Sequence, residues 1–174
     1  IREAVGEKFI ILYRQSVIEL VPEGSRLEEL IAIAQRAEAA GVNILNTHVG
    51  WHQASIPTIA SCVPRAAWTD FIAMLRPHIA IPLVTTNRIN SPKVAEEILA
   101  AGKADIIAMA RPFLADPEFV NKAAAGLADR INTCIACNQG CLDHLFRHKI
   151  VTCLVNPRAC QETQLNYLPV KQVK

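Results

Sequence analysis

The stretch "IAIPLVTTNRINSPKVAEEILAAGKADIIAMAR" (residues 79–111) decides the fold. It begins and ends with short apolar runs, "IAIPLVTTN" and "ADIIAMAR", which are typical of strands covered on both faces. Between them, Ser91 and Pro92 form a helix start signal, and Gly102 stands where the helix is expected to end. Two strands joined by a helix in this way predict a parallel βαβ unit.

The same alternation of strand and helix runs through the first 130 residues. Apolar runs predict four strands, at residues 9–16 ("FIILYRQS"), 42–49 ("VNILNTHV"), 79–87 and 104–111. Between the first two strands, Ser25 and Glu28 form a capping box that predicts a helix start, and Gly41 marks the helix end. Further helices are predicted at residues 66–75 and 116–126.

Four β-α units in a row predict a parallel sheet that is either doubly wound or part of a closed barrel. No G-x-G-x-x-G motif follows the first strand, which disfavours the dinucleotide-binding version of the doubly wound sheet. An eight-stranded barrel needs about 250 residues. We therefore expect an α/β fold; if it is a (β/α)8 TIM barrel, residues 1–130 form its C-terminal half, and residues 131–174 form an appended segment.

Polar side chains stand where the predicted strands end. They are Arg14 in the first strand, His48 and His52 after the second, Arg88 after the third, and Arg111 at the end of the fourth. The carboxyl ends of barrel strands carry the chemistry, and the loops after the last two commonly bind a phosphate, which suits two arginines. Surface or helix-dipole roles remain alternatives for the arginines. The two histidines are not expected to bind zinc as a pair, because residues four positions apart lie on the same face only in a helix, and this stretch is predicted to be strand and loop.

Four cysteines near the C-terminal end, Cys134, Cys137, Cys141 and Cys153, form a C-x2-C-x3-C-x11-C pattern. A zinc ribbon would pair two C-x2-C knuckles, whereas three close thiolates and one distant one favour an iron-sulfur cluster. Zinc and unliganded thiols remain alternatives, and His144 and His148 are further potential ligands at surface positions. Cys62 and Cys160 are interpreted as plain buried or loop cysteines.

Composition excludes several functional classes. The net charge is +2 with scattered lysines and arginines, so there is no basic stripe for nucleic acid. No run approaches the roughly 20 apolar residues of a membrane span, and no signal peptide is present, so we expect a cytoplasmic protein without membrane partners. The chain begins at Ile1, without a methionine, in what reads as the tail of a helix, so the sequence need not be a whole protein.

Taken together, these features resemble the bacterial NADPH-dependent 2,4-dienoyl-CoA reductases, members of the old yellow enzyme-like flavin oxidoreductases. The resemblance covers essentially all 174 residues. Its most specific stretches are "HVGWHQASIPTIA", "VTTNRIN", "ADIIAMARPFLADPEFVNKA", "NTCIACNQGCLDH" and "TCLVNPRAC". It implies an FMN-binding barrel, a segment that binds a 4Fe-4S cluster, and FAD- and NADPH-binding domains outside this chain. Electrons would pass from NADPH through FAD, the cluster and FMN to 2,4-dienoyl-CoA, in the β-oxidation of unsaturated fatty acids.

The resemblance also implies roles for individual residues. Arg14 is similar to the residue that contacts the FMN ring, Arg88 and the Ala110-Arg111 turn to the phosphate site, and His52 to the active-site histidine. The cluster ligands would be Cys134, Cys137, Cys141 and Cys153. A guanidinium beside the flavin stabilises the negative charge of the reduced ring. A histidine can donate the proton that reduction of a conjugated thioester requires.

The family's catalytic tyrosine and first four strands would precede Ile1, and its FAD and NADPH domains would follow Lys174. We therefore expect a fragment that is inactive alone, with an acyl-CoA substrate and the remainder of the parent chain as partners. Its exposed sheet edges would favour self-association. Related enoate reductases, trimethylamine dehydrogenase-like enzymes and a non-redox zinc-stabilised module are the alternative interpretations.

Overall fold

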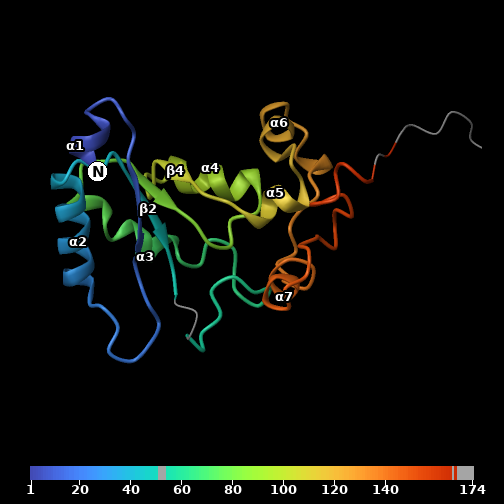
Figure 1. Ribbon diagram of the computed structural model, residues 1–174, viewed down its shortest axis with the longest axis horizontal. Helices are drawn as coiled ribbons and strands as arrows, with labels where there is room; N and C mark the ends of the chain where they lie inside the picture. Colours follow the sequence, from blue (N-terminus) through green and yellow to red (C-terminus); the bar gives the residue numbers. More distant parts are fainter. Residues whose placement is uncertain (51–53, 166, 168–174) are drawn as a thin grey trace, which may run out of the picture. The chain divides into compact units, whose positions relative to one another are not determined.

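The computed structural model describes residues 1–50, 54–165 and 167. The chain divides into two compact units, Ile1–Met109 and Ala110–Lys174, whose elements are labelled in Figure 1. The first unit ends before the predicted boundary at residue 130. None of the helices in the described ranges is both long enough and apolar enough to cross a membrane.

The first unit is built on a four-stranded parallel sheet. Its strands are β1 (Leu12–Ser16), β2 (Ile44–His48), β3 (Leu83–Thr85) and β4 (Ile106–Ile107), in the order β1-β2-β3-β4. Every neighbouring pair is parallel. The predicted parallel α/β sheet is confirmed, although each strand is shorter than the apolar run that predicted it.

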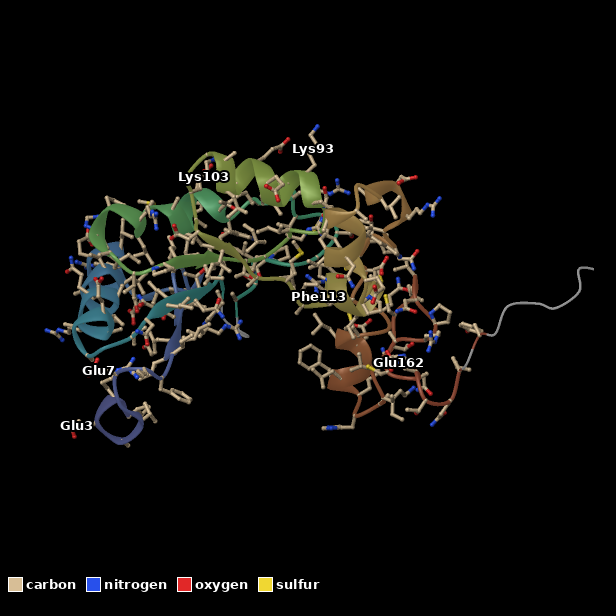
Figure 2. The ribbon with its side chains drawn as sticks, turned by 90° about the horizontal axis from the view of Figure 1, so that it is seen from above. Glu3, Glu7, Lys93, Lys103, Phe113 and Glu162 are labelled. Atoms are coloured by element: carbon tan, nitrogen blue, oxygen red, sulfur yellow. The ribbon has the colours of Figure 1, made fainter. Side chains whose placement is uncertain are left out.

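One short helix of the first unit precedes β1, and the others connect the strands in chain order. They are α1 (Arg2–Val5), α2 (Leu27–Ala39), α3 (Thr69–Ala73), the short 3-10 helix η1 (Arg76–His78) and α4 (Pro92–Ala100). Figure 2 shows Lys93 in the first turn of α4 and Lys103 just beyond its end. The signals at Ser91 and Gly102 are confirmed, since the Ser91 hydroxyl caps α4 and Gly102 has a φ of 66°.

The start of α2 differs from the prediction. The backbone N–H and the hydroxyl of Ser25 both donate to the carboxylate of Glu19, at 2.8 and 3.3 Å, so Ser25 does not cap the helix. Instead, the N–H of Arg26 donates to the side chain of Glu29 at 2.8 Å. The predicted capping box of Ser25 and Glu28 was wrong by one residue, because a distant carboxylate competes for Ser25.

The helices of the first unit pack on one face of the sheet. Leu45 and Leu83, which are register partners, are fully buried in one core cluster with Ala34 of α2 and Ile72 of α3. Thr85 and Ile107 are register partners, and Thr85 is two residues from Leu83, so both lie on the same face as Leu83. Ile107 packs against the core cluster that contains Ala95 and Ile98 of α4. One face of the sheet therefore carries α2, α3 and α4.

The opposite face of the sheet is uncovered at its edge strands β1 and β4, whereas Val84 of β3 on this face is 3% exposed. It carries Leu12 and Ile106, which are 51% and 39% exposed, and the exposed side chain of Arg14. A doubly wound sheet has helices on both faces, whereas a barrel wall has them on its outer face alone. The packing favours the barrel arrangement.

The second unit contains α5 (Arg111–Ala115), α6 (Phe119–Ala124), the 3-10 helix η2 (Ala128–Arg130) and α7 (Leu142–Phe146). The rings of Phe113, labelled in Figure 2, and Phe119 meet edge to face with centroids 6.0 Å apart. Arg111 was predicted at the end of the fourth strand, which is wrong. β4 ends at Ile107, and Arg111 begins α5, because Pro112 is pre-set for the first turn of a helix.

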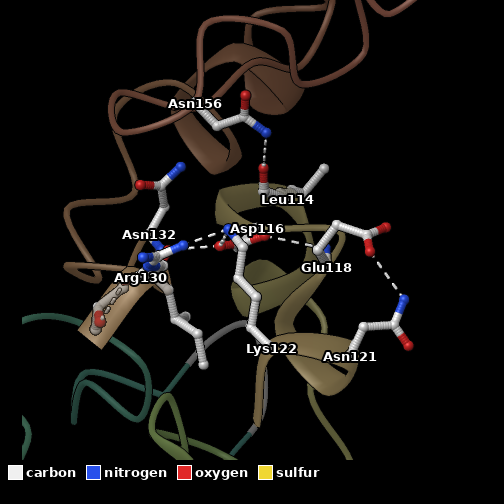
Figure 3. A network of polar contacts seen from close by, with 10 residues as sticks. Leu114, Asp116, Glu118, Asn121, Lys122, Arg130, Asn132 and Asn156 are labelled. Atoms are coloured by element: carbon white, nitrogen blue, oxygen red, sulfur yellow. Dashed lines mark hydrogen bonds and ion pairs between the residues drawn. The ribbon is translucent and has the colours of Figure 1, made fainter. Parts of the chain in front are cut away.

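Asp116 organises the second unit through a buried network, shown in Figure 3. Asp116 is 2% exposed. Its carboxylate accepts hydrogen bonds from Lys122 Nζ at 2.6 Å, from the N–H of Asn132 at 2.9 Å and from the N–H of Glu118 at 3.0 Å. Burial alone would raise the pKa of Asp116, but these hydrogen bonds and the charge of Lys122 outweigh it, and the net pKa is lowered.

The network ties both ends of the cysteine segment to the helices of the same unit. Asn132, two residues before Cys134, donates its N–H to Asp116. Asn156, three residues after Cys153, donates its side-chain amide to the carbonyl of Leu114 at 2.8 Å (Figure 3). The loop that carries the cysteines is therefore fixed at its entry and its exit.

Candidate functional site

The four cysteines of the C-x2-C-x3-C-x11-C pattern line one cavity in the second unit. It has about 330 Å³ of space, part of it open to solvent. Its lining residues are Arg111, Leu114, Cys134, Ile135, Cys137, Asn138, Gly140, Cys141, Thr152, Cys153, Leu154 and Val155. The structure thus brings together four thiols that span 20 residues of sequence.

Two left-handed residues curl the first part of the cysteine loop. Ala136 has a φ of 55° and Asn138 a φ of 63°, so the backbone turns sharply on either side of Cys137. Asparagine tolerates this conformation well, whereas for alanine it costs about 1–2 kcal/mol. Such strain is often stored at functional sites, and here it places three closely spaced cysteines around a single cavity.

The fourth cysteine is brought in by a close approach of two backbones. The N–H of Thr152 donates to the carbonyl of Gly140 at 2.8 Å. A Cβ at position 140 would stand 3.0 Å from the carbonyl oxygen of Thr152, closer than nine in ten real contacts. Glycine at 140 therefore allows Cys153 to lie beside the loop that carries Cys141.

We expect Gly140→Ala to weaken the cysteine site. The added methyl group would push the Thr152 backbone away by a few tenths of an ångström, at a cost of about 1–3 kcal/mol for overpacking. Metal retained after gel filtration of the intact protein should fall below that of the wild type. Gly126→Ala is the control for general strain in the second unit, because its φ of 72° disfavours alanine although a Cβ there meets nothing within 4 Å, and it should retain more metal than Gly140→Ala. Equal metal content in wild type and Gly140→Ala would contradict this account of the loop.

The thiols of the cavity influence one another electrostatically. Burial raises the pKa of the Cys141 thiol, and nearby Cys134 and Cys137 raise it further. The N–H of Leu142 and the guanidinium of Arg111 act in the opposite direction. A bound metal ion would stabilise the thiolate form of Cys141, because the thiolate is the form that ligates metal.

Four cysteines on one cavity fit a 4Fe-4S cluster by number and chemistry, since each of its four irons takes one thiolate. A single zinc ion would require all four sulfurs about 2.3 Å from one point. Within residues 1–50, 54–165 and 167, no three cysteine, histidine, aspartate or glutamate side chains are grouped to hold a single metal ion. The fit to a cluster therefore depends on the shared cavity.

The uncovered face of the sheet in the first unit collects polar side chains. Arg14 of β1 is the register partner of Asn46 of β2, and Ser16 is the partner of His48, so all four share that face. Asn46 Oδ1 is buried and has no hydrogen-bond partner among the residues that the structure describes. An exposed guanidinium beside such an amide suits the polar edge of a flavin ring, and the residues here fit FMN.

Arg88 lies beyond the end of β3 in a left-handed turn. Asn87 and Arg88 have φ values of 70° and 58°, an unusual pair of consecutive left-handed residues. The Nε of Arg88 donates to the carbonyl of Val63 at 2.8 Å, and the carbonyl of Arg88 accepts from the N–H of Ala66 at 3.1 Å. The turn thus joins the end of β3 to the loop that follows β2, and the phosphate role of Arg88 stays a prediction.

None of the remaining candidate residues that the structure describes lines the cavity of the four cysteines. His52 lies outside the described residues, and Ala110 directly precedes α5. His144 is half-buried, with its Nδ1 2.9 Å from the carbonyl oxygen of Ile150, and His148 is exposed. Neither lines the cavity of the four cysteines. Cys62 and Cys160, interpreted as plain cysteines, are likewise exposed and outside it.

Sequence reasoning missed two residues at these sites, Asn46 and Asn138. Asn46 could have been found as an amide in the middle of the apolar run "VNILNTHV". Asn138 follows a cysteine of the motif directly, and asparagine is among the residues that favour left-handed turns.

The chain is similar to several redox proteins along nearly its whole length. A metal reductase of Desulforamulus reducens is 43% identical to 99% of this chain, and an NADH oxidase of Thermoanaerobacter brockii is 37% identical to 99% of it. The chain covers 26% and 27% of these relatives. A solved complex of 2-naphthoyl-CoA reductase with 2-naphthoyl-CoA matches 94% of the chain with a TM-score of 0.91 and 34% identity, and the chain covers 25% of it.

Residues 1–130 match the NADH:flavin oxidoreductase / NADH oxidase family. The similar proteins are redox enzymes by name, and the family implies FMN as the cofactor. This chain belongs to the NADH:flavin oxidoreductase / NADH oxidase family.

Proposed function

We propose that this chain is the part of a flavin-dependent reductase that holds FMN on a half-barrel and a 4Fe-4S cluster on four cysteines. The observation that carries the proposal is the shared cavity of Cys134, Cys137, Cys141 and Cys153 in a chain of a flavin oxidoreductase family. When bound, the cluster would supply electrons one at a time and FMN would supply hydride. The four thiolates would be its ligands.

The polar residues of the uncovered sheet face would bind the flavin. The guanidinium of Arg14 would stabilise negative charge on the reduced ring, which favours its reduction. Asn46, whose buried oxygen has no hydrogen-bond partner in the described part of the chain, would meet the polar edge of the ring. In the first unit, the guanidinium of Arg88 would bind the FMN phosphate.

His52 would hold the proton that reduction of a conjugated substrate requires. Hydride delivered to one carbon leaves negative charge that a second atom must take up with a proton, and an imidazole is suited to give it near neutral pH. His48, the last residue of β2, lies on the uncovered face of the sheet, where we propose that the flavin binds, and His52 is four residues further along the chain. The proposed proton donor therefore follows closely, along the chain, the strand that carries part of the proposed flavin face.

We propose a conjugated acyl-CoA thioester, 2,4-dienoyl-CoA, as the substrate. The stretch "HVGWHQASIPTIA" supports it, as does the high structural similarity to a reductase solved with an aromatic acyl-CoA thioester. A second candidate is reduction of a metal ion, favoured by the relative at 43% identity that is named a metal reductase.

The chain spans about a quarter of the length of the relatives it matches. Activity is therefore proposed for the whole protein, with FAD and NADPH bound by parts outside this chain. The uncovered sheet face, with exposed Leu12 and Ile106, would face the rest of the barrel.

The proposed substrate is tested on the intact protein under anaerobic conditions. We expect kcat/KM for NADPH-driven reduction of 2,4-dienoyl-CoA to exceed that for a ferric chelate by at least about tenfold, since a pocket that recognises the thioester discriminates by that much or more. A higher kcat/KM with ferric chelate and no dienoyl-CoA turnover would assign the protein to metal reduction instead.

His52→Ala provides a test of the proton donor in the same assay. Substrate reduction should slow by about 100-fold or more, the usual contribution of a positioned acid, while flavin reduction by NADPH stays unchanged. His78→Ala is the matched control, because His78 is an exposed residue of η1. Normal turnover of dienoyl-CoA by His52→Ala would remove this residue from the mechanism.

A further inference from the structure

Arg111 lies at the cysteine cavity of the second unit. It is the first residue of α5, is half-buried and lines the cavity together with all four cysteines. Among the described residues that line this cavity, Arg111 alone carries a permanent charge, and the others are thiols, amides, a hydroxyl, a glycine and aliphatic groups. A cation in such surroundings is expected only where negative charge compensates it.

Asn138 fixes the guanidinium in place. The Nη1 of Arg111 donates to Oδ1 of Asn138, which lies between Cys137 and Cys141 in the sequence. Asn138 is itself held in a left-handed turn, and its carbonyl accepts from the N–H of Asp143 at 3.0 Å at the start of α7. The charge of Arg111 is therefore tied to the same loop that carries three of the cysteines.

We infer that Arg111 is the positioning and charge-compensating residue of the four-cysteine site, where it raises the reduction potential of the bound cluster. The inference deepens the proposed function and rests on it, since it assumes a 4Fe-4S cluster. Net charge is one of the factors that set cluster potentials. Uptake of one electron, without a proton and without breaking a bond, adds one negative charge, which a fixed guanidinium in a partly desolvated cavity stabilises.

This role is separate from the phosphate role expected for the Ala110-Arg111 turn. A phosphate held at the start of α5 would use backbone N–H groups, whereas the side chain of Arg111 contacts the cysteine loop. Arg111 can therefore serve the cluster through its guanidinium whatever its backbone binds.

The test is a redox titration of the cluster in the intact protein, followed by its paramagnetic signal. Arg111→Gln should lower the midpoint potential, and Arg111→Lys, which keeps the charge, should recover most of the difference. Arg130→Gln removes the same charge from an exposed position of the second unit outside the cavity and should leave the potential unchanged.

Asn138→Gly is the second variant, because glycine adopts the left-handed turn freely and removes only the amide that holds Arg111. Its potential should also fall, by less than that of Arg111→Gln. If Arg111→Gln loses its iron, Asn138→Gly decides the question. Wild-type potentials in the iron-loaded variants would overturn the role of Arg111 while leaving the cluster proposal intact. Absence of iron from the wild type would instead reject the proposed function.

Discussion

Replacing Asp116 with alanine is expected to destabilise the second unit by about 3 kcal/mol. The carboxylate is almost fully buried and accepts three hydrogen bonds, and its removal leaves the ammonium of Lys122 and the N–H of Asn132 without their acceptor. In hydrogen–deuterium exchange of the intact protein, amides of residues 119–133 should exchange roughly a hundredfold faster. Because Asn132 leads into Cys134, metal retention should fall as well.

Asp129→Ala is the matched control for Asp116→Ala. Asp129 is an exposed carboxylate of η2 in the same unit, and its loss should change stability by less than about 0.5 kcal/mol. Equal exchange in the wild type and Asp116→Ala would show that the buried network does not hold the cysteine segment.

The contribution of Asp116 should also depend on pH. The folded protein lowers the pKa of Asp116 below its ordinary value of about 3.9, so the folded state binds the proton more weakly than the unfolded state does. The stabilisation is fully present above that ordinary value and is lost as the pH falls through the folded pKa. The stability difference between wild type and Asp116→Asn should therefore be largest above about pH 5 and shrink in more acid solution.

Cys141→Ser is expected to abolish NADPH-driven substrate reduction. Cys141 lines the cavity with the other three ligands, and a cluster deprived of one of its four thiolates should be lost from the protein. The rate should fall to background in a steady-state assay. Substrate reduction driven by a chemical reductant that reaches FMN directly should persist, since Arg14, Asn46 and Arg88, whose side chains are proposed to bind the flavin, lie in the first unit.

Cys160→Ser is the control that separates the site from general thiol effects. Cys160 belongs to the same unit but is exposed and does not line the cavity. It should keep its iron and its rate. A Cys141→Ser protein with wild-type iron content and NADPH-driven rate would remove Cys141 from the ligand set.

Much of the fold follows from local signals in the sequence. The β-branched runs give all four strands, and Ser91, Gly41 and Gly102 mark helix ends correctly, because capping and left-handed turns are properties of neighbouring residues. The cysteine spacing likewise identifies the four residues that line one cavity. These features depend on residues close together in the chain.

The errors come from interactions that compete with the signals used for prediction or that join separate parts of the chain. Ser25 fails as a cap because Glu19 binds it, and strand residues near Arg111 are lost because Pro112 starts α5. The Arg111–Asn138 contact joins residues 27 positions apart, and no periodicity reveals it. The role of Gly140 is hidden for the same reason, since it depends on the backbone of Thr152.

The central claim is that four cysteines hold a 4Fe-4S cluster, and the metal content of the intact, anaerobically purified protein tests it most directly. Iron, acid-labile sulfide and zinc should be measured on one sample together with its visible absorption. The account predicts about four irons and four sulfides per chain in a coloured protein, with one iron for each of the four thiolates of a 4Fe-4S cluster. A colourless protein with one zinc and no sulfide would contradict it.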